Sequence, residues 1–163
     1  MNKELPKRKR NRLEEFDYAL NGAYFVTICV SGRHAMLWDS TAFQETPSKN
    51  EIRLSRYGEI IDQGIHDIEL YYPQVAVDKY CIMPDHVHMI LLFKPIADGR
   101  MISAPTLSTV VGQMKRWVSR QIGFSLWQKS FYDRIIRNEA EYQQIWKYID
   151  ENPVKIRMIG EHM

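Results

Sequence analysis

The sequence predicts an α+β fold of the split βαβ type, a ferredoxin/RRM-like sandwich in which a four-stranded antiparallel sheet carries two helices on one face, plus a C-terminal helix. Three observations predict it. Strand-like and helix-like segments follow the order β-α-β-β-α-β-α, and no repeat or low-complexity tract interrupts them. The chain has 163 residues, 45% hydrophobic and 26% charged, which suits one globular domain. The third helix is then an extra element, free to carry function.

The first half of the chain contains a strand, a loop and a helix. Residues 24–30 (YFVTICV) are rich in aromatic and β-branched side chains and lie between Asn-Gly and Ser-Gly pairs, which predicts a strand. Residues 31–50 are typical of a loop. From residue 51, hydrophobic residues recur at roughly helical spacing, which predicts a helix that ends at Tyr72 because Pro73 follows it.

The second half supplies a hairpin, two helices and a short strand. Residues 75–83 and 86–93 are strand-like runs joined by Pro84 and Asp85, which predicts an antiparallel hairpin. An apolar stripe over 107–122, followed by Gly123, predicts a helix, and residues 131–137 predict a short fourth strand. A last helix, 139–151, should end before Pro153, because proline disfavours helical geometry in the residue before it.

Charge and cysteine content limit the class of protein. We divide the chain into a basic N-terminal arm, residues 1–20, and a single domain, residues 21–163. The arm is either a solvated tail or a nucleic-acid contact. The longest apolar run is too short to cross a bilayer and the N-terminus lacks a secretory signal, so we expect a cytoplasmic protein without a membrane partner. Cys29 and Cys81 lack CxxC spacing and should be buried, reduced thiols.

Two histidines stand two residues apart in the most hydrophobic segment of the chain, in the sequence DHVH (85–88). On a strand, residues i and i+2 point to the same face, so His86 and His88 should project side by side. Paired neutral imidazoles form half of a transition-metal site. The alternative is one hydrogen-bonded core histidine and one exposed histidine, and the spacing alone leaves both readings open.

The C-terminal helix carries a second pair of polar side chains. Tyr148 and Asn152 are four residues apart and therefore lie one turn from each other on the same helix face. An asparagine can donate its carbonyl oxygen to a metal, and a tyrosine offers a phenol. The alternative is that this face is the packed stripe of an amphipathic helix, which the spacing alone favours.

Taken in order, the segments PDHVHMIL, LWQKSFYDRIIRNEAEY and YIDENPVK resemble those of the single-tyrosine HUH transposases (Y1, IS200-like), in particular the branch associated with repetitive extragenic palindromes (REP). The strand YFVTICV resembles that branch too, and the similarity spans residues 20–157. The resemblance implies that His86 and His88 hold a divalent metal ion, Mg or Mn, and that Asn152 completes the metal site. It also implies that Tyr148 is the nucleophile and that the fold is the split βαβ sandwich.

The activity implied by this resemblance is that of a DNA transposase. Such an enzyme is a metal-dependent single-strand endonuclease and strand transferase that nicks and rejoins hairpin-bearing DNA through a 5′-phosphotyrosine intermediate. Six cationic side chains could neutralise DNA phosphates, although each could equally be an ordinary surface charge: Lys115, Arg116, Arg120, Arg134, Arg137 and Lys147. The family includes monomers and dimers, and we expect a homodimer here.

Two other functions stay open at this point. The first is a catalytically silent single-stranded nucleic-acid-binding protein on the same sheet, because this sandwich is shared with RNA-recognition domains. The second is metal-dependent hydrolysis of a small phosphoester, in which a metal-bound water attacks and Tyr148 is only structural. A covalent protein–DNA adduct would separate the first hypothesis from both alternatives.

Overall fold

The computed structural model describes residues 22–39, 52–94 and 105–161 and confirms the predicted fold class. Its elements, in chain order, are β1 (Gly22–Cys29), the 3-10 turn η1 (Ser31–Arg33), α2 (Arg56–Tyr71), β2 (Val75–Ile82), β3 (His86–Phe93), α3 (Leu107–Ile122), β4 (Tyr132–Ile135) and α4 (Glu139–Glu161). The predicted basic arm, residues 1–20, lies outside the described residues.

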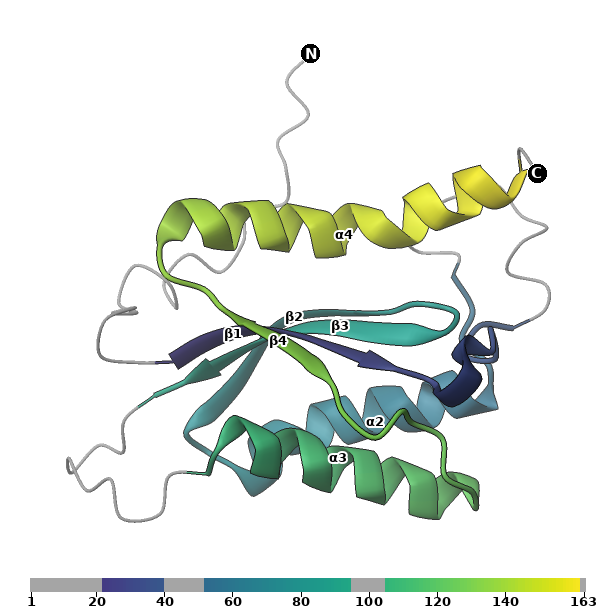
Figure 1. Ribbon diagram of the computed structural model, residues 1–163, viewed down its shortest axis with the longest axis horizontal. Helices are drawn as coiled ribbons and strands as arrows, with labels where there is room; N and C mark the ends of the chain where they lie inside the picture. Colours follow the sequence, from purple (N-terminus) through teal and green to yellow (C-terminus); the bar gives the residue numbers. More distant parts are fainter. Residues whose placement is uncertain (1–21, 40–51, 95–104, 162–163) are drawn as a thin grey trace.

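The four strands form one antiparallel sheet in the order β2-β3-β1-β4. The two central strands, β1 and β3, pair over their whole length, from Gly22 opposite Phe93 to Cys29 opposite His86. Figure 1 shows α2 and α3 against one face of the sheet and α4 across the other. The sheet therefore has two covered faces, and the paired histidines lie at one end of a central strand.

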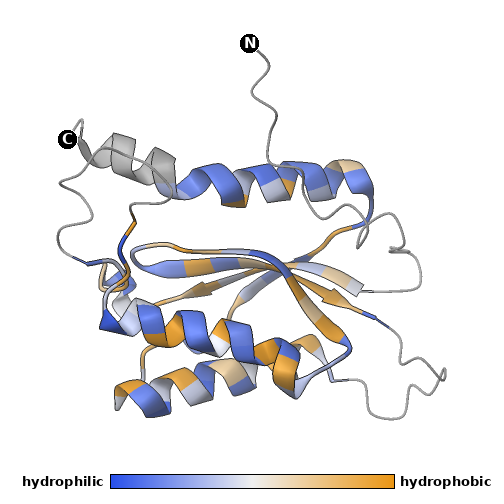
Figure 2. Cartoon of the chain, turned by 180° about the vertical axis from the view of Figure 1, so that it is seen from behind, coloured by the Kyte–Doolittle hydropathy of each residue, from blue (hydrophilic) through white to orange (hydrophobic). Residues whose placement is uncertain are grey.

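Alternation along the strands divides the hydrophobic core between the two faces. The larger cluster lies between the sheet and helices α2 and α3 and includes Val26, Ile28 and Met89. A smaller cluster lies under α4, where Ile90 of β3 packs with Tyr142 of the helix. In Figure 2, hydrophobic and hydrophilic positions alternate along α2 and α3, whereas the described part of α4 is mostly hydrophilic. Only part of the second face is therefore sealed by apolar contacts.

Helix α2 begins later than predicted, at Arg56 rather than at residue 51. Ser55 is its N-cap, because the Ser55 hydroxyl accepts a hydrogen bond from the backbone N–H of Gly58. Leu54, which was counted in the helical stripe, instead forms an isolated bridge with Trp38. The periodicity was extended too far because extended residues with alternating hydrophobic side chains can mimic the start of a helical stripe.

Helix α4 was predicted to end before Pro153, but it continues to Glu161. The proline ring removes one backbone N–H, which would otherwise bond to the carbonyl of Ile149, four residues earlier. Pro153 and Asn152 are both buried. Tertiary packing has therefore overridden the local preference of the chain, and the helix extends beyond the residues that matter for the site.

Both cysteines are free thiols, as expected. Cys29 is buried at the end of β1, and Cys81 is partly buried on β2. Burial raises the pKa of the Cys81 thiol to about 12. Among the residues that the structure describes, no helix is long and apolar enough to cross a bilayer.

An ion pair fixes α4 to the edge strand β2. The Lys79 ammonium lies 2.8 Å from the Asp150 carboxylate, and the two side chains are only 25% and 14% exposed. The same ammonium lies over the Trp146 ring, 4.3 Å from its centroid. One turn earlier on the helix, the Tyr142 hydroxyl donates to the carboxylate of Asp78. These contacts determine which face of α4 meets the sheet.

Replacing Lys79 by methionine should lower the free energy of unfolding by about 1–3 kcal/mol, because a partly buried carboxylate loses its charged hydrogen-bond donor. Urea denaturation followed by circular dichroism measures this change. Lys147→Met is the matched control, since the Lys147–Glu151 contact is long, 3.9 Å, and exposed. Equal stability of the two variants would contradict a specific role for the Lys79–Asp150 pair.

Candidate active site

The two predicted histidines meet at their ring nitrogens. His86 and His88 project from the same face of β3, and their Nε2 atoms are 3.1 Å apart. The ring centroids are 4.6 Å apart, with the planes at 75° to each other. The structure therefore brings the two imidazoles together on one face, as the i, i+2 spacing predicted.

Each ring has a polar partner at its other nitrogen. His86 Nδ1 lies 2.6 Å from Oδ1 of Asp85, and His88 Nδ1 lies 2.9 Å from Oγ1 of Thr27, which is paired with His88 across the β1–β3 ladder. Asp85 is itself held by Arg33, whose Nε donates to Oδ2 at 2.8 Å. Although burial opposes ionisation, hydrogen bonds from His86 and Arg33 keep the pKa of Asp85 below its ordinary value.

His88 is buried and neutral. Only 6% of its surface is exposed, and burial, with the neighbouring His86 as a smaller cause, lowers the pKa of His88 to about 3. The Phe25 ring stacks on the His88 ring with centroids 5.2 Å apart and planes at 28°. A neutral imidazole held on one side by an aromatic ring has a lone pair available for a cation.

Tyr148, on helix α4, lies against the histidine pair of strand β3. Its ring centroid is 5.4 Å from that of His88 and 6.2 Å from that of Phe25. The Tyr148 side chain is 48% exposed, in contrast to Tyr142 and Ile149 on the same helix, which are fully buried. The phenol is therefore next to the imidazoles and accessible to a large substrate.

Asn152 lies one turn further along α4 than Tyr148 and is buried, with 9% of its surface exposed. The helix begins near the Ala23 end of the sheet and passes His88 at Tyr148, so Asn152 lies further towards the end at which His86 lies. Within the described ranges, no three His, Cys, Asp or Glu side chains form a metal-binding cluster. Asn152 offers a donor of another kind, an amide carbonyl oxygen.

The histidine pair fits a divalent ion. Two nitrogens that each lie about 2.1 Å from one ion, at roughly right angles, are about 3 Å apart, which is the separation of the two Nε2 atoms. Partners at both Nδ1 atoms leave the Nε2 atoms as the available ligands. The two imidazole nitrogens and the amide oxygen of Asn152 on α4 are donor types that are compatible with such an ion.

Comparison with known proteins shows which proteins this chain is similar to. No protein-family model matches the chain. It is 26% identical over 166 residues to an uncharacterized protein of Haemophilus influenzae, covering 90% of this chain and 88% of that one. It is 28% identical over 147 residues, 85% of this chain and 74% of the relative, to a second Haemophilus influenzae protein, whose name provisionally makes it a REP-associated tyrosine transposase.

This chain is similar to the REP-associated tyrosine transposases. A solved structure of a REP-associated tyrosine transposase bound to a REP hairpin has the same fold, with a TM-score of 0.59 at 22% identity, over 82% of this chain and 67% of that one. The resemblance predicted from the motifs is therefore confirmed. The roles of single residues still rest on their geometry in this chain.

Two of the predicted DNA-contacting cations lie on the same side of the sheet as Tyr148. Arg134 of β4 pairs with Phe25 and so points to the same face, and it is exposed. Lys147 precedes Tyr148 on α4 and is also exposed. Arg137 lies at the other end of the sheet, because its neighbour Ile136 donates its backbone N–H to Ala23. It is distant along the strand from the histidine pair.

Lys115 has a structural contact. Its ammonium donates to the backbone carbonyl of Gln128 at 2.8 Å and lies 3.4 Å and 3.5 Å from those of Ser130 and Lys129. Burial lowers the pKa of this ammonium below its ordinary value. Lys115 thus fixes the segment before β4 to α3, which is a role that the sequence did not predict.

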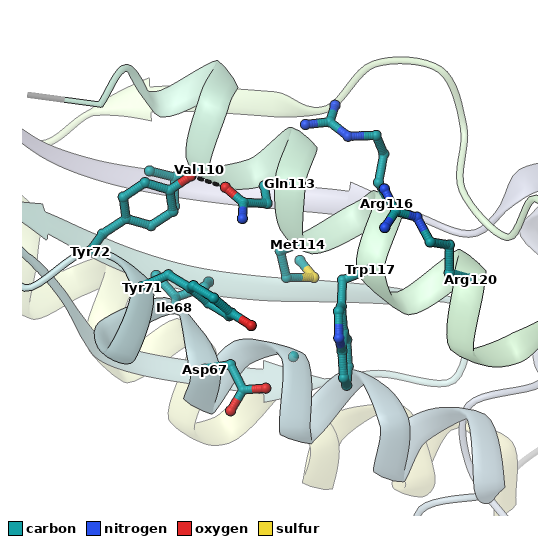
Figure 3. A pocket seen from close by; sticks show the side chains of 11 residues that line it. Asp67, Ile68, Tyr71, Tyr72, Val110, Gln113, Met114, Arg116, Trp117 and Arg120 are labelled. Atoms are coloured by element: carbon teal, nitrogen blue, oxygen red, sulfur yellow. Dashed lines mark hydrogen bonds between the residues drawn. The ribbon is translucent and has the colours of Figure 1, made fainter. Parts of the chain in front are cut away.

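Arg116 and Arg120 lie on the opposite side of the sheet from Tyr148. They are exposed on α3, at one end of a hollow of about 320 Å³ between α2 and α3, whose walls include Trp117 and Tyr71 (Figure 3). Both arginines also border a more open groove of about 660 Å³ between α3 and residues 123–129. This α3 groove also contains Lys115 and Lys129, and none of the described residues that line it is acidic.

The sequence analysis missed several residues of the site. Thr27 and Phe25 lie in the strand YFVTICV, but their contacts depend on how β1 pairs with β3, which alternation alone does not reveal. Asp85 was assigned only to a turn, although its position beside His86 was a signal. Arg33 has a positive φ of 56°, which sequence reasoning does not predict for an arginine.

Proposed function

We propose that this protein is a REP-associated-type tyrosine transposase that cuts and rejoins single-stranded, hairpin-bearing DNA through a covalent bond to Tyr148. One observation carries the proposal: the Tyr148 phenol lies beside two imidazoles whose Nε2 atoms face each other. The similarity to a relative with this name, and the fold shared with a transposase bound to a REP hairpin, support DNA as the substrate.

A divalent cation, Mg or Mn, is part of this proposal. His86 and His88 would hold it through Nε2, and Asn152 would add its carbonyl oxygen. When bound, such a cation polarises a non-bridging phosphate oxygen and orients the scissile bond for in-line displacement. The remaining contributions come from side chains of this chain.

The phenol oxygen of Tyr148 attacks phosphorus, the P–O3′ bond breaks, and the new bond is a 5′-phosphotyrosine. The proton of the phenol leaves as the bond to phosphorus forms. Because Tyr148 is half exposed, water can accept this proton, and the departing 3′-oxygen takes one up. The reverse reaction, with a 3′-hydroxyl as the nucleophile, rejoins the strand without an external energy source.

Tyr148 is a better candidate for the nucleophile than the two nearest alternatives in sequence. Tyr142 is fully buried, and its hydroxyl donates to Asp78. Tyr132 is exposed, but it lies on β4, where it pairs with Thr27 of β1. It is part of the sheet surface beside the histidines. Its position suits stacking against an unpaired base, which is common in single-strand binders.

The DNA would follow two cationic regions. Arg134 and Lys147 flank the Tyr148 side, and the α3 groove lies on the other side of the sheet. The segment that borders this groove passes the end of β1, where Gln128 donates its N–H to the carbonyl of Cys29. A strand that leaves the histidine pair can therefore reach the groove around the end of the sheet.

The proposal does not require a second copy of the chain. The contact between Tyr148 and His88 lies within one chain, and the cluster under α4 holds the helix in that position. The homodimer expected from the family stays a prediction. Sedimentation of the chain measures whether it forms a dimer. Mixing a variant that lacks Tyr148 with one that lacks His88 and measuring the yield of adduct then distinguishes a site shared between two chains from a site within one chain.

Replacing Tyr148 by phenylalanine should abolish the covalent adduct and leave DNA affinity largely unchanged, because only the attacking oxygen is removed. The substrate is a single-stranded palindromic oligonucleotide labelled at its 3′ end, since the 5′-phosphate stays on the tyrosine. A denaturing gel in the presence of Mn²⁺ reports the adduct. Tyr132→Phe is the matched control and should retain it. An adduct that persists in Tyr148→Phe excludes this mechanism, and binding without any cleavage by the wild type favours the silent DNA-binding alternative.

Removing one arginine of the α3 groove, by Arg116→Ala or Arg120→Ala, should weaken hairpin binding and reduce the slope of log affinity against log salt by about 1, as expected for one lost phosphate contact. Fluorescence anisotropy over a range of salt concentrations measures this slope. Lys94→Ala removes an exposed cation that does not line the groove and should leave the slope unchanged. Identical slopes in all three variants would contradict a DNA contact in the groove.

A further inference from the structure

We infer that Thr27 and the Asp85–Arg33 pair are positioning residues, which let both imidazoles present their Nε2 lone pairs to one cation. The Asp85–Arg33 pair fixes the orientation and tautomer of His86, and Thr27 holds the His88 ring while pairing with either of its tautomers. The inference rests on the proposed function. It deepens that function by assigning a role to three side chains that do not touch the substrate or the cation themselves.

Asp85 determines the tautomer of His86. Oδ1 of Asp85 lies 2.6 Å from His86 Nδ1, and an ionised carboxylate can only accept a hydrogen bond. The proton of the neutral ring must therefore be on Nδ1, and Nε2 carries a lone pair. Asp85 thus fixes one tautomer and prevents the ring from rotating by 180°, which would exchange the two nitrogens.

Arg33 holds this carboxylate from the other side. Its Nε donates to Oδ2 of Asp85 at 2.8 Å, and its Nη1 lies 3.1 Å from the sulfur of Cys29, the residue opposite His86 in the sheet. Arg33 has a φ of 56° and follows Gly32, whose φ is 71°. A positive φ is unfavourable for an arginine, so the turn after β1 adopts a costly conformation that directs the guanidinium to Asp85.

His88 has a different kind of partner. A threonine hydroxyl both donates and accepts, so Thr27 does not fix the tautomer of His88. Without a cation, His88 can carry its proton on Nε2 and donate it to His86 Nε2 across the 3.1 Å gap, while Nδ1 accepts from Thr27. With a cation between the rings, the proton must be on Nδ1, and the Thr27 hydroxyl turns to accept it.

The His86 ring is thus held in one tautomer, whereas the Thr27 hydroxyl can form a hydrogen bond with either tautomer of His88. This division avoids two lone pairs facing each other at 3.1 Å when no cation is bound. A carboxylate at position 27 would force that repulsion, and a methyl group would leave Nδ1 of a buried ring unpaired. A threonine at position 27 suits both states of the site.

The test uses the full chain with Mn²⁺ and Co²⁺ as probes. Thr27→Val keeps the shape of the side chain and removes the hydroxyl, whereas Thr27→Ser keeps the hydroxyl. Calorimetric titration should show affinity for both ions lowered by about 10–100-fold in Thr27→Val and close to the wild-type value in Thr27→Ser. Saturating Mn²⁺ should restore adduct formation in Thr27→Val, because Tyr148 and both histidines are intact.

Asp85→Ala provides the same test for His86 and does not alter the interior of the sheet. It should weaken ion binding by a similar factor, about 10–100-fold. Urea unfolding in EDTA reports whether either variant acts through stability alone, since a merely structural role changes that transition and not the affinity of the folded chain for Mn²⁺.

Wild-type affinity in Thr27→Val or in Asp85→Ala, or an equal loss in Thr27→Ser, overturns the inference while leaving the proposed function intact. A wild-type chain that binds neither ion and forms no adduct overturns both. A wild-type chain that forms the adduct in EDTA overturns the inference and the cation of the proposed function, and leaves Tyr148 as the nucleophile.

Discussion

The register between β1 and β3 is the constraint on which the rest of the site depends. It places Thr27 opposite His88, so that His88 meets its hydrogen-bond partner, and it places Cys29, which contacts Arg33, opposite His86. A shift of one residue would turn Phe25 and Thr27 to the α2 and α3 side and put Val26 and Ile28, which are fully buried, on the polar side. The larger hydrophobic cluster, on the other face of the sheet, therefore specifies the face on which the histidine pair lies.

The second requirement is the rotation of α4 about its own axis. Consecutive helix positions differ by about 100°, so Tyr148 faces His88 only while Ile145 and Ile149 point down onto the sheet. The Lys79–Asp150 pair reinforces this orientation from the β2 edge. A nucleophile on a helix that is anchored over several turns is placed more accurately than one on a loop. This explains why a helix outside the βαββαβ unit can carry the reactive group.

The sequence predicted the elements of the fold, because hydrophobic periodicity and turn residues act locally. Leu107–Ile122 agrees with the predicted helix since Thr106 and Gly123 mark both of its ends. The predicted start of α2 and the predicted end of α4 were wrong because Leu54 forms a bridge with Trp38 and Pro153 is buried, which are tertiary effects. For the site, spacing correctly brought His86 and His88 to one face. It could not reveal Thr27 or Arg33, whose roles depend on strand register and on a backbone conformation with positive φ.

The face under α4 is divided along the strands, and this division determines access to the site. Towards the Gly22 end, Ala23, Ile90 and Leu92 are buried by the helix. Towards the other end, the same face presents Thr27, His86 and His88, and its neighbour on the edge strand, Tyr132, is 67% exposed. Tyr148 lies at the boundary between these halves, which accounts for its partial exposure. A helix that sealed the whole face would hold Tyr148 more firmly but would exclude a DNA strand, so incomplete burial of this face is a structural requirement of the proposed chemistry.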